Sequence, residues 1–217
     1  MIYYEDRDII VCEKPYGVSS QLSSGENMIQ ILKSHTGCEI FPVHRLDIGT
    51  SGVMVYAKNK ESASRLSIDI SNHCFEKEYL CICHGAPYEN GEMIDYLYHD
   101  RIKNKSFIAK TKRNGSKEAR LKFWTIARSK NVQKELSLVR VLLETGRTHQ
   151  IRAQFSSRGY FLYGDGKYGA RDNDKIALHS YKIVFKHPTT KKQMEYKSLP
   201  NGGIWDSFDL NIIENDG

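Results

Sequence analysis

The chain has 217 residues, of which 40% are hydrophobic and 27% are charged, and its formal net charge is +6. This composition is ordinary for a globular protein with a full core, and the positive charge favours polyanionic partners. No stretch approaches the ~20 apolar residues of a membrane span, and the first residues lack an export signal, so we expect a cytoplasmic protein.

The predicted elements of the first 40 residues alternate between strand, turn and helix. Residues 8–13 (DIIVCE) favour a short strand, and residues 14–17 (KPYG) combine Pro, Gly and an aromatic residue, which is typical of a turn. Apolar residues between 28 and 32 then recur at helical spacing. Gly37 is expected to end that helix.

Residues 44–52 read HRLDIGTSG and form the most informative segment of the chain. Asp47 lies there among cations, hydroxyls and glycines, and the apolar residues 53–57 that follow are typical of a strand. A carboxylate on a tight loop at a strand edge is well placed for catalysis, because rigid elements hold such loops in position. Taken alone, Asp47 fits a structural role better, as the cap of its own loop.

The rest of the chain continues the interleaving of strands and short helices. Residues 63–70 have a helical apolar period, whereas residues 78–83, 134–144 and 176–185 are rich in strand formers. No repeat, flexible linker or low-complexity tract interrupts the chain. We therefore predict an α+β fold in one domain, residues 1–217, around a largely antiparallel or mixed sheet flanked by helices.

Residues 101–122 form a basic stretch with nine Lys and Arg residues against a single acid, Glu118. Asn114-Gly115 at its centre is a strong signal for a two-residue hairpin. Charge runs are usually solvated faces. This run is one-sided and has phenylalanines within and just after it, which favours contact with a nucleic acid.

The cysteines are odd in number and none forms a CxxC pair, so the spacing does not suggest structural zinc. We expect no metal site and reduced, partly buried thiols. The five residues concerned are Cys12, Cys38, Cys74, Cys81 and Cys83.

A second polar segment, residues 145–152, reads TGRTHQIR. Thr148 is expected to cap a short helix on which His149 and Arg152, three residues apart, share a face. The N-terminus of a helix also attracts anions. The segment therefore predicts a cationic, donor-rich patch that could bind a phosphate or keep a neighbouring carboxylate ionised.

Read together, the segments HRLDIGTSG and TGRTHQIR resemble the RluA family of pseudouridine synthases. Four further segments agree in order. Residues 10–17 resemble the family's opening strand and KPxG turn, and residues 77–80 its Tyr-bearing strand. Residues 163–169 resemble its GDxxYG segment, and residues 178–188 its C-terminal LH…F.HP strand. The resemblance implies the pseudouridine synthase fold, and 217 residues leave no room for the additional RNA-binding domain with which many members begin.

This resemblance implies isomerisation of a uridine in structured RNA, ribosomal or transfer, with no cofactor and no metal. Asp47 matches the catalytic Asp, as a nucleophile or as a base. Tyr79 matches the Tyr that stacks on the flipped uracil and is a candidate to remove the proton from its carbon 5. Arg152 matches the Arg that ion-pairs with the catalytic Asp. Ile151 matches an apolar residue packed near the uracil, and Arg45 an Arg that some members insert into the RNA.

The remaining expected RNA contacts are side chains that can bind phosphates or bases. The target base must leave its helix, at a cost of a few kcal/mol, so the RNA left behind needs support. Beyond Arg45 and Ile151, the expected contacts are Lys14, Lys110, Lys112, Arg113, Arg147, His149 and Gln150. Three of them have a structural alternative: Lys14 as part of a turn, Arg147 as the cap of an acid within the fold, and His149 as a core or loop histidine. We expect the protein to act as a monomer.

Two rival functions differ in what they require of the sequence. A catalytically silent RNA-binding protein on the same fold predicts loss of Asp47, Tyr79 or Arg152, and all three are present. A phosphotransferase is suggested by HRLD, but the Gly-rich nucleotide loop and DFG-type metal site that it needs do not occur in the sequence. One departure from the family, Ala-Arg-Leu at residues 119–121 in place of an A-T-x-Y pattern, bears on RNA contacts rather than on bond-making.

Overall fold

The computed structural model describes residues 1–129 and 135–213, which divide into two compact units. Unit 1 comprises residues 1–77 and 179–200, and unit 2 comprises residues 78–178 and 201–217. Each unit is therefore built from two separate stretches of the chain. Among the described residues, no helix is long and apolar enough to cross a bilayer.

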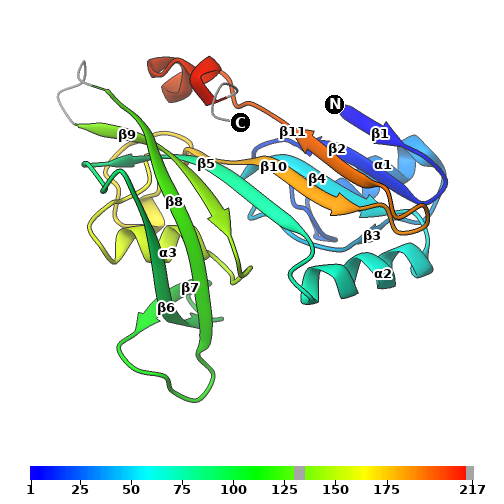
Figure 1. Ribbon diagram of the computed structural model, residues 1–217, viewed down its shortest axis with the longest axis horizontal. Helices are drawn as coiled ribbons and strands as arrows, with labels where there is room; N and C mark the ends of the chain where they lie inside the picture. The colour runs from blue at the N-terminus through cyan, green and yellow to red at the C-terminus, as the bar shows by residue number, and fades with distance from the viewer. Residues whose placement is uncertain (130–134, 214–217) are drawn as a thin grey trace. The chain divides into compact units, whose positions relative to one another are not determined.

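Unit 1 is a mixed sheet with two helices (Figure 1). Its central strand, β4, pairs antiparallel with β2 and β3 and parallel with β10, while β1 and β11 extend the sheet on β2 and β10. The elements are β1 (Ile2–Glu5), β2 (Ile9–Lys14), α1 (Met28–Thr36), β3 (Phe41–Pro42), β4 (Ser51–Ala57), α2 (Lys60–Ser71), β10 (Leu178–Lys186) and β11 (Gln193–Lys197).

The two helices of unit 1 begin and end where the sequence signals them. The Asn27 side chain accepts from Gln30 N at the start of α1, and Gly37, in the left-handed conformation with φ 68°, ends it. The Asn59 side chain caps α2 in the same way, by accepting from Ser62 N. The helical predictions for both segments are confirmed.

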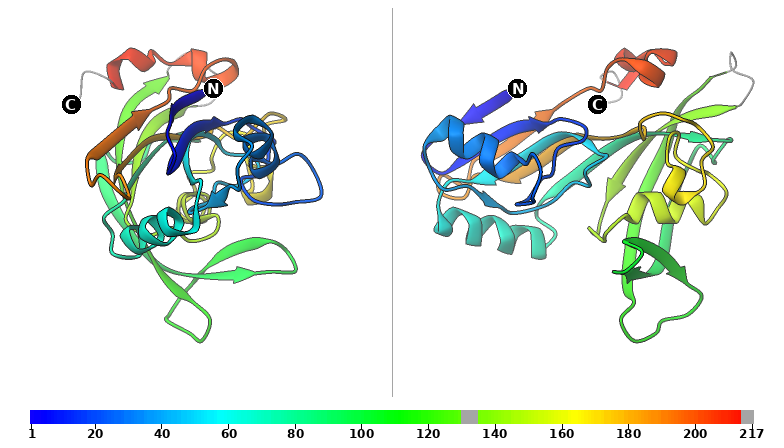
Figure 2. Two further views of the ribbon diagram at one scale, coloured as in Figure 1. Left: turned by 90° about the vertical axis from the view of Figure 1, so that its right-hand side faces the viewer. Right: turned by 180° about the vertical axis from the view of Figure 1, so that it is seen from behind.

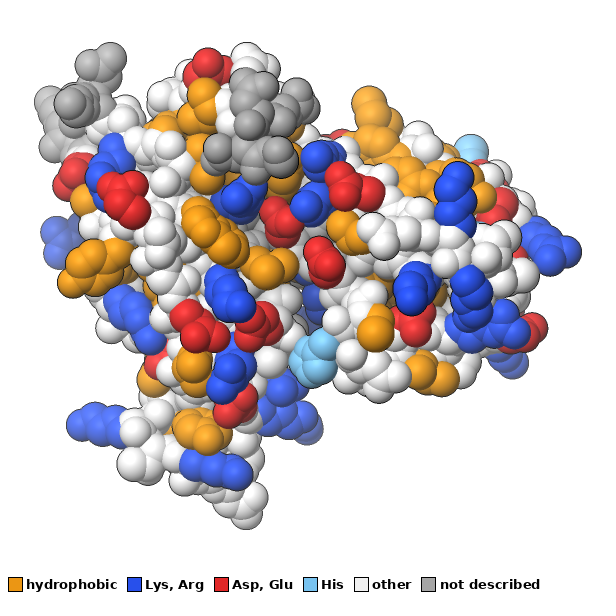
Figure 3. Space-filling view, in the orientation of Figure 1, with side chains coloured by type: hydrophobic (Ala, Val, Ile, Leu, Met, Phe, Trp, Pro, Cys, Tyr) orange, Lys and Arg blue, Asp and Glu red, His pale blue; other side chains and the backbone are white. Residues whose placement is uncertain are grey.

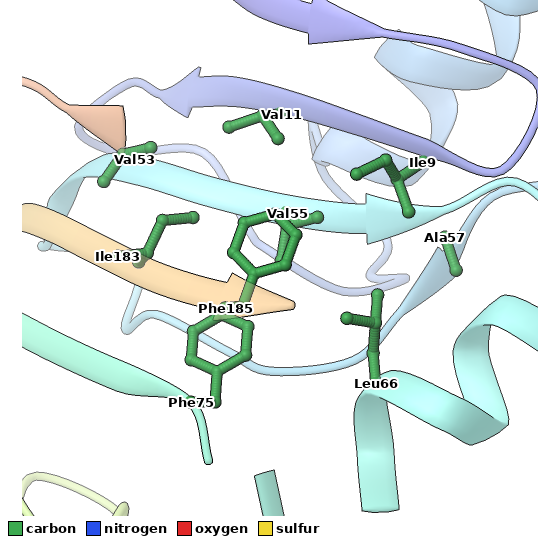
Figure 4. Close-up of a cluster of buried hydrophobic side chains, with 9 residues drawn as sticks. All are labelled: Ile9, Val11, Val53, Val55, Ala57, Leu66, Phe75, Ile183 and Phe185. Atoms are coloured by element: carbon green, nitrogen blue, oxygen red, sulfur yellow. The ribbon is translucent and has the colours of Figure 1, made fainter. Parts of the chain in front are cut away.

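The core of unit 1 lies between the sheet and α2, as Figure 4 shows. Alternate residues of β2 and β4 point into it because side chains of a strand alternate between its two faces. Leu66 of α2 and two stacked rings, Phe75 and Phe185, close the cluster. Burying each large apolar side chain contributes about 1.5–3 kcal/mol, so this cluster firmly supports the strand that follows the Asp47 loop. Its buried members are Ile9, Val11, Val53, Val55, Ala57, Leu66, Phe75, Ile183 and Phe185.

Unit 2 is an antiparallel sheet in the order β5-β9-β8-β6-β7, against which α3 packs through β6 and β7 (Figure 2). Its elements are β5 (Glu76–His84), β6 (Asn90–Asp100), β7 (Lys105–Ala109), β8 (Lys117–Ser129), β9 (Leu136–Leu143), α3 (Gln150–Ser156) and the 3-10 helices η1 (Gly166–Tyr168), η2 (Gly203–Ser207) and η3 (Leu210–Ile213). The strand predicted over residues 134–144 is β9, although residue 134 lies outside the described residues. The predicted α+β class is confirmed.

The hairpin predicted at Asn114-Gly115 is wrong. β7 and β8 do not pair with each other but lie on opposite sides of β6, which pairs with both. The hairpin is instead β6–β7, and residues 110–116 form a loop that leads from β7 past β6 to β8. Asn114-Gly115 still makes a tight turn, because Ser116 N donates to Arg113 O at 3.0 Å and Gly115 has a φ of 80°. We call residues 110–116 the basic loop.

Candidate active site

The Asp47 loop lies between β3 and the first residue of β4, and backbone hydrogen bonds define its shape. Thr50 N donates to Asp47 O at 3.0 Å, which closes a tight turn, and Gly17 N donates to Ile48 O at 2.9 Å, which ties the loop to the KPYG turn. Asp47 is half-buried at this edge of the sheet. The loop thus presents a carboxylate from a backbone that two neighbouring segments hold in place.

Lys14 stabilises the Asp47 loop from inside the protein. Its side chain is fully buried, and its ammonium donates to the carbonyls of Pro15, Val18 and Ile48 at 2.8, 2.6 and 3.3 Å. Burial lowers the pKa of Lys14 to about 8, and the negative charge of Asp47 opposes that shift. This ammonium thus binds the loop that carries Asp47, and contact of Lys14 with RNA stays a prediction.

Two histidines bind residues of β4, the strand that follows the Asp47 loop. Ser51 Oγ lies 2.8 Å from His179 Nδ1, and His179 Nε2 lies 2.9 Å from the carbonyl of Ser198. A carbonyl only accepts, so Nε2 carries the proton and Nδ1 accepts from Ser51. His44 Nε2 accepts from Val55 N at 3.2 Å. Burial lowers the pKa of His179 to about 4 and that of His44 to about 3, so both are neutral at pH 7.

These neutral histidines predict acid lability of unit 1. As the pH falls from about 6.5 towards 4, the unfolded chain protonates both imidazoles while the folded protein does not. The unfolded state therefore binds more protons, and the free energy of unfolding should fall by about 1.4 kcal/mol per pH unit for each histidine. Urea unfolding across this range measures the slope.

His179→Gln should remove about half of that slope. The matched control is His35→Gln, because the His35 side chain is 50% exposed and lies 3.2 Å from the surface acid Glu5. Equal slopes for the two variants would contradict the assignment of acid lability to buried imidazoles.

Tyr79 and Ile151 are both buried in unit 2. Tyr79 lies on β5 opposite Val141 of β9 and is 6% exposed, and Ile151, on the first turn of α3, is 4% exposed. Strands β5 and β9 and helix α3 therefore hold the two side chains that are predicted to lie near the uracil. Their roles towards a uracil stay predictions.

The start of α3 differs from the prediction that Thr148 caps it. The N-cap is His149, in the left-handed conformation with φ 53° and no side-chain cap bond. A non-glycine residue in this region costs on the order of 1–3 kcal/mol, which the surrounding contacts must offset. Among those contacts, His149 Nδ1 lies 3.2 Å from Tyr168 Oη, and the residue is 8% exposed.

The Gln150 side chain is buried, and its amide holds the turn that precedes α3. Its Oε1 accepts from Thr145 Oγ1 at 2.8 Å and from Arg147 N at 3.0 Å, while its Nε2 donates to Arg120 O at 3.0 Å. The amide thereby fixes the TGRT turn against β8. Gln150 and His149 are 2% and 8% exposed, and their contacts with RNA stay predictions.

Arg152 binds a carboxylate that the sequence analysis did not assign to it. Its Nε and Nη2 donate to the two oxygens of Asp165 at 2.8 and 2.7 Å, and the Asp165 side chain is 1% exposed. Asp165 belongs to the GDGKYG segment. This segment resembles the family, but the resemblance implies no role for its residues. Pairing of Arg152 with Asp47 stays a prediction.

Comparison with known proteins identifies the family to which this arrangement belongs. Residues 8–157 match the family model described as RNA pseudouridylate synthase. The chain is 31% identical over 223 residues to the tRNA pseudouridine synthase C of Haemophilus ducreyi. This alignment covers 91% of the chain and 90% of the relative. The chain belongs to the RNA pseudouridine synthase family. The predicted RluA-type family membership and enzymatic activity are confirmed.

One further relative and one solved structure resemble the synthase. The synthase is 32% identical over 208 residues to the ribosomal large subunit pseudouridine synthase C of Buchnera aphidicola. This alignment covers 89% of the chain and 65% of the relative. A solved human structure, RNA pseudouridylate synthase domain containing 1, has a TM-score of 0.79 at 22% identity and covers 92% of the synthase and 82% of that chain. The second likeness shows that the fold is shared.

The basic loop presents a group of exposed cations. Lys110, Lys112 and Arg113 are all exposed, and the Arg113 guanidinium stacks at 4.5 Å over the ring of Tyr98 on β6. Figure 3 shows Lys and Arg side chains on the end of β6–β8 that carries this loop. Arg147 is half-buried, and its Nε donates to Glu118 O at 2.8 Å.

One cluster of the synthase, Asp6, Asp8 and His187, has the residue types of a metal site. Its ligand atoms already bind protein groups. His187 Nε2 lies 2.8 Å from Asp6 Oδ2, and its Nδ1 accepts from the backbone N–H groups of Thr189 and Thr190. These bonds satisfy both ring nitrogens, so the cluster fastens the turn after β10 to the start of β2.

Proposed function

We propose that Asp47, Tyr79 and Arg152 carry the isomerisation of uridine in RNA. The ribose C1′–N1 bond breaks, a bond from C1′ to carbon 5 of uracil forms, and the proton on carbon 5 moves to N1. Asp47 supplies the carboxylate, as nucleophile or as base. Tyr79 stacks on the uracil and removes the proton from carbon 5, and Arg152 keeps Asp47 ionised.

The observation that carries this proposal is the construction of the Asp47 loop. A half-buried carboxylate stands on a backbone held by Lys14 and by the KPYG turn, so its position is fixed before RNA binds. Preorganised groups save the cost of reorganisation during the reaction. An Asp that only capped its own loop would not need a buried ammonium beside it.

We propose ribosomal or transfer RNA as the substrate. Relatives that the synthase resembles at 31% and 32% identity are named for transfer RNA and for the ribosomal large subunit, respectively. Pseudouridine mapping across total RNA from cells with and without the gene tests this directly. A uridine modified only when the gene is present identifies the target, and identical maps from both cells would contradict the proposal.

We also propose that the synthase acts as a monomer in the cytoplasm. All five cysteines are free thiols, as expected in a reducing compartment. Each proposed site residue comes from a single chain. Light scattering of the free protein tests the monomer, and imaging of the tagged protein in its own cells tests the compartment.

The basic loop is proposed to bind RNA phosphates. Replacing Lys110, Lys112 and Arg113 together with Gln should weaken RNA binding and reduce the slope of log K against log salt by about 2, because each phosphate contact contributes about 0.7–0.9. Filter binding of bulk transfer RNA across a salt series measures both effects.

The control variant removes three positive charges from unit 1 instead, at exposed lysines on its helices and in a turn. Its substitutions are Lys33→Gln, Lys60→Gln and Lys192→Gln. This control should keep most of the salt slope. If both triple variants lose the same slope, the basic loop contributes only through net charge.

A further inference from the structure

We propose that Asp165 is a positioning residue that fixes the orientation of Arg152, and that Tyr168 ties this arginine to the strand leading into the basic loop. This inference deepens the proposed function and rests on it. All the contacts that support it lie within unit 2. The two residues come from the GDGKYG segment, to which neither the sequence analysis nor the proposed chemistry gives a role.

The Asp165–Arg152 pair fixes both the direction and the plane of the guanidinium. Two parallel N–H···O bonds hold the Nε–Nη2 edge, which a single bond or a lysine ammonium would not do. The side chains of Arg152 and Asp165 are 12% and 1% exposed. A buried pair of this kind contributes little net stability, whereas removal of one partner leaves a buried charge without its counterion. Orientation is therefore the role that its geometry serves best.

The segment that carries Asp165 is itself held rigidly. Gly164 has a φ of 74°, and a Cβ there would lie 2.2 Å from the carbonyl oxygen of Lys175. Gly164 N also donates to Asp172 Oδ2 at 3.2 Å, and that carboxylate oxygen lies 2.6 Å from His84 Nε2 on β5. Asp165 thus projects from a turn anchored to the strand that also carries Tyr79.

Tyr168 connects this turn to β7 through its hydroxyl. The hydroxyl accepts from Ser106 N at 2.8 Å and donates to Ser106 O at 3.0 Å. A hydroxyl has one proton and two acceptor sites, so the His149 nitrogen 3.2 Å away donates to it. The hydroxyl is fully used, and it joins β7 to the first residue before α3.

The ring of Tyr168 lies close to two cations. The Arg152 guanidinium is 5.1 Å and the Lys105 ammonium 4.7 Å from its centroid. Lys105 begins β7, which runs directly into the basic loop. One buried ring therefore contacts both the proposed catalytic arginine and the strand that supports the RNA-binding loop.

Asp165→Asn tests the positioning role, because an amide keeps the shape but offers one acceptor oxygen instead of two charged ones. The substrate is bulk transfer and ribosomal RNA labelled with tritium at uridine carbon 5, from cells lacking the enzyme. We expect kcat to fall by about 10- to 100-fold, as when an orienting partner is removed, with KM within about twofold. Asp174→Asn, which removes an exposed charge elsewhere in unit 2, is the control and should retain full activity.

A double-mutant cycle with Arg152→Lys separates positioning from a general structural effect. If Asp165 acts through Arg152, Asp165→Asn should lower kcat further by less than about twofold in the Arg152→Lys background. Independent, multiplicative losses would overturn the proposal. Tyr168→Phe keeps the ring but removes the hydroxyl and its bonds to Ser106 and His149, and should lower kcat about fivefold. An unchanged kcat would overturn the role of Tyr168.

A measurement without RNA distinguishes failure of this inference from failure of the proposed function. The Nε–Hε resonance of Arg152 in nitrogen-15 spectra should be sharp and protected in the wild type and in Asp174→Asn, and exchange-broadened in Asp165→Asn. If the wild type releases no tritium from any RNA while the resonance behaves in this way, the proposed function fails and the pairing stands. An equally sharp resonance in Asp165→Asn would overturn the positioning role whatever the activity.

Discussion

Asp47→Asn is expected to abolish pseudouridine formation, with turnover falling by about 10⁴-fold or more, while RNA binding stays within a few-fold of the wild type. Asn has nearly the same shape but is neither a nucleophile nor a base at neutral pH. The contacts that shape the loop are made to its backbone carbonyls, by Thr50 N to Asp47 O and by the Lys14 ammonium to Ile48 O, and not to the Asp47 carboxylate. The loop should therefore persist while its chemistry is lost.

Release of tritium from RNA labelled at uridine carbon 5 measures the turnover, and filter binding measures the affinity. Asp69→Asn on α2 is the matched control, because it makes the same change on the same unit away from the loop. Full activity in Asp47→Asn would refute the catalytic assignment. Loss of RNA binding in parallel with turnover would instead assign Asp47 to recognition.

The sequence predicts well those features that depend on local chemistry. Asn27 and Gly37 mark the ends of α1 because a side-chain cap and a left-handed glycine act within one turn of the chain. The apolar alternation of β4 likewise locates a strand and its buried face. Asp47 becomes a catalytic candidate only when a second motif about a hundred residues later is read with it.

The errors arise where a distant partner decides the outcome. Asn114-Gly115 makes its predicted turn, but the strands on either side pair with β6, which no local signal specifies. Lysine is rarely buried, so the sequence does not predict that three carbonyls, one of them 34 residues away, receive the Lys14 ammonium. His149 takes the cap position expected for Thr148 because Tyr168 stabilises it there.

Gly52→Ala is expected to destabilise the synthase by about 3–5 kcal/mol, a large fraction of the stability of a typical domain. Gly52 ends the HRLDIGTSG motif and has a φ of 116°, a backbone conformation that strains any residue with a Cβ. A Cβ there would also lie 2.3 Å from the carbonyl oxygen of Ser180 and 2.6 Å from its nitrogen. Neither atom belongs to a flexible side chain that could move aside.

The position of Gly52 explains why the clash cannot be relieved cheaply. Gly52 is paired with Ser180 where β4 and β10 run parallel, and with Lys14 of β2 on its other side. The Ser180 hydroxyl donates to Val53 O at 3.0 Å, which ties the strands at the next residue. Separating β4 from β10 would also disturb the Ser51–His179 bond beside the Asp47 loop. Alanine at position 52 should therefore lower activity as well as stability.

Three glycine variants separate backbone strain from steric overlap. Gly25→Ala meets nothing within 4 Å and has no left-handed φ, so the free energy of unfolding should change by less than about 0.5 kcal/mol. Gly37→Ala meets nothing either but has a φ of 68°, and should cost about 1 kcal/mol. Only Gly52→Ala combines both effects. If urea unfolding gave Gly37→Ala and Gly52→Ala equal losses, close packing of β4 against β10 would not be the reason that the motif ends in glycine.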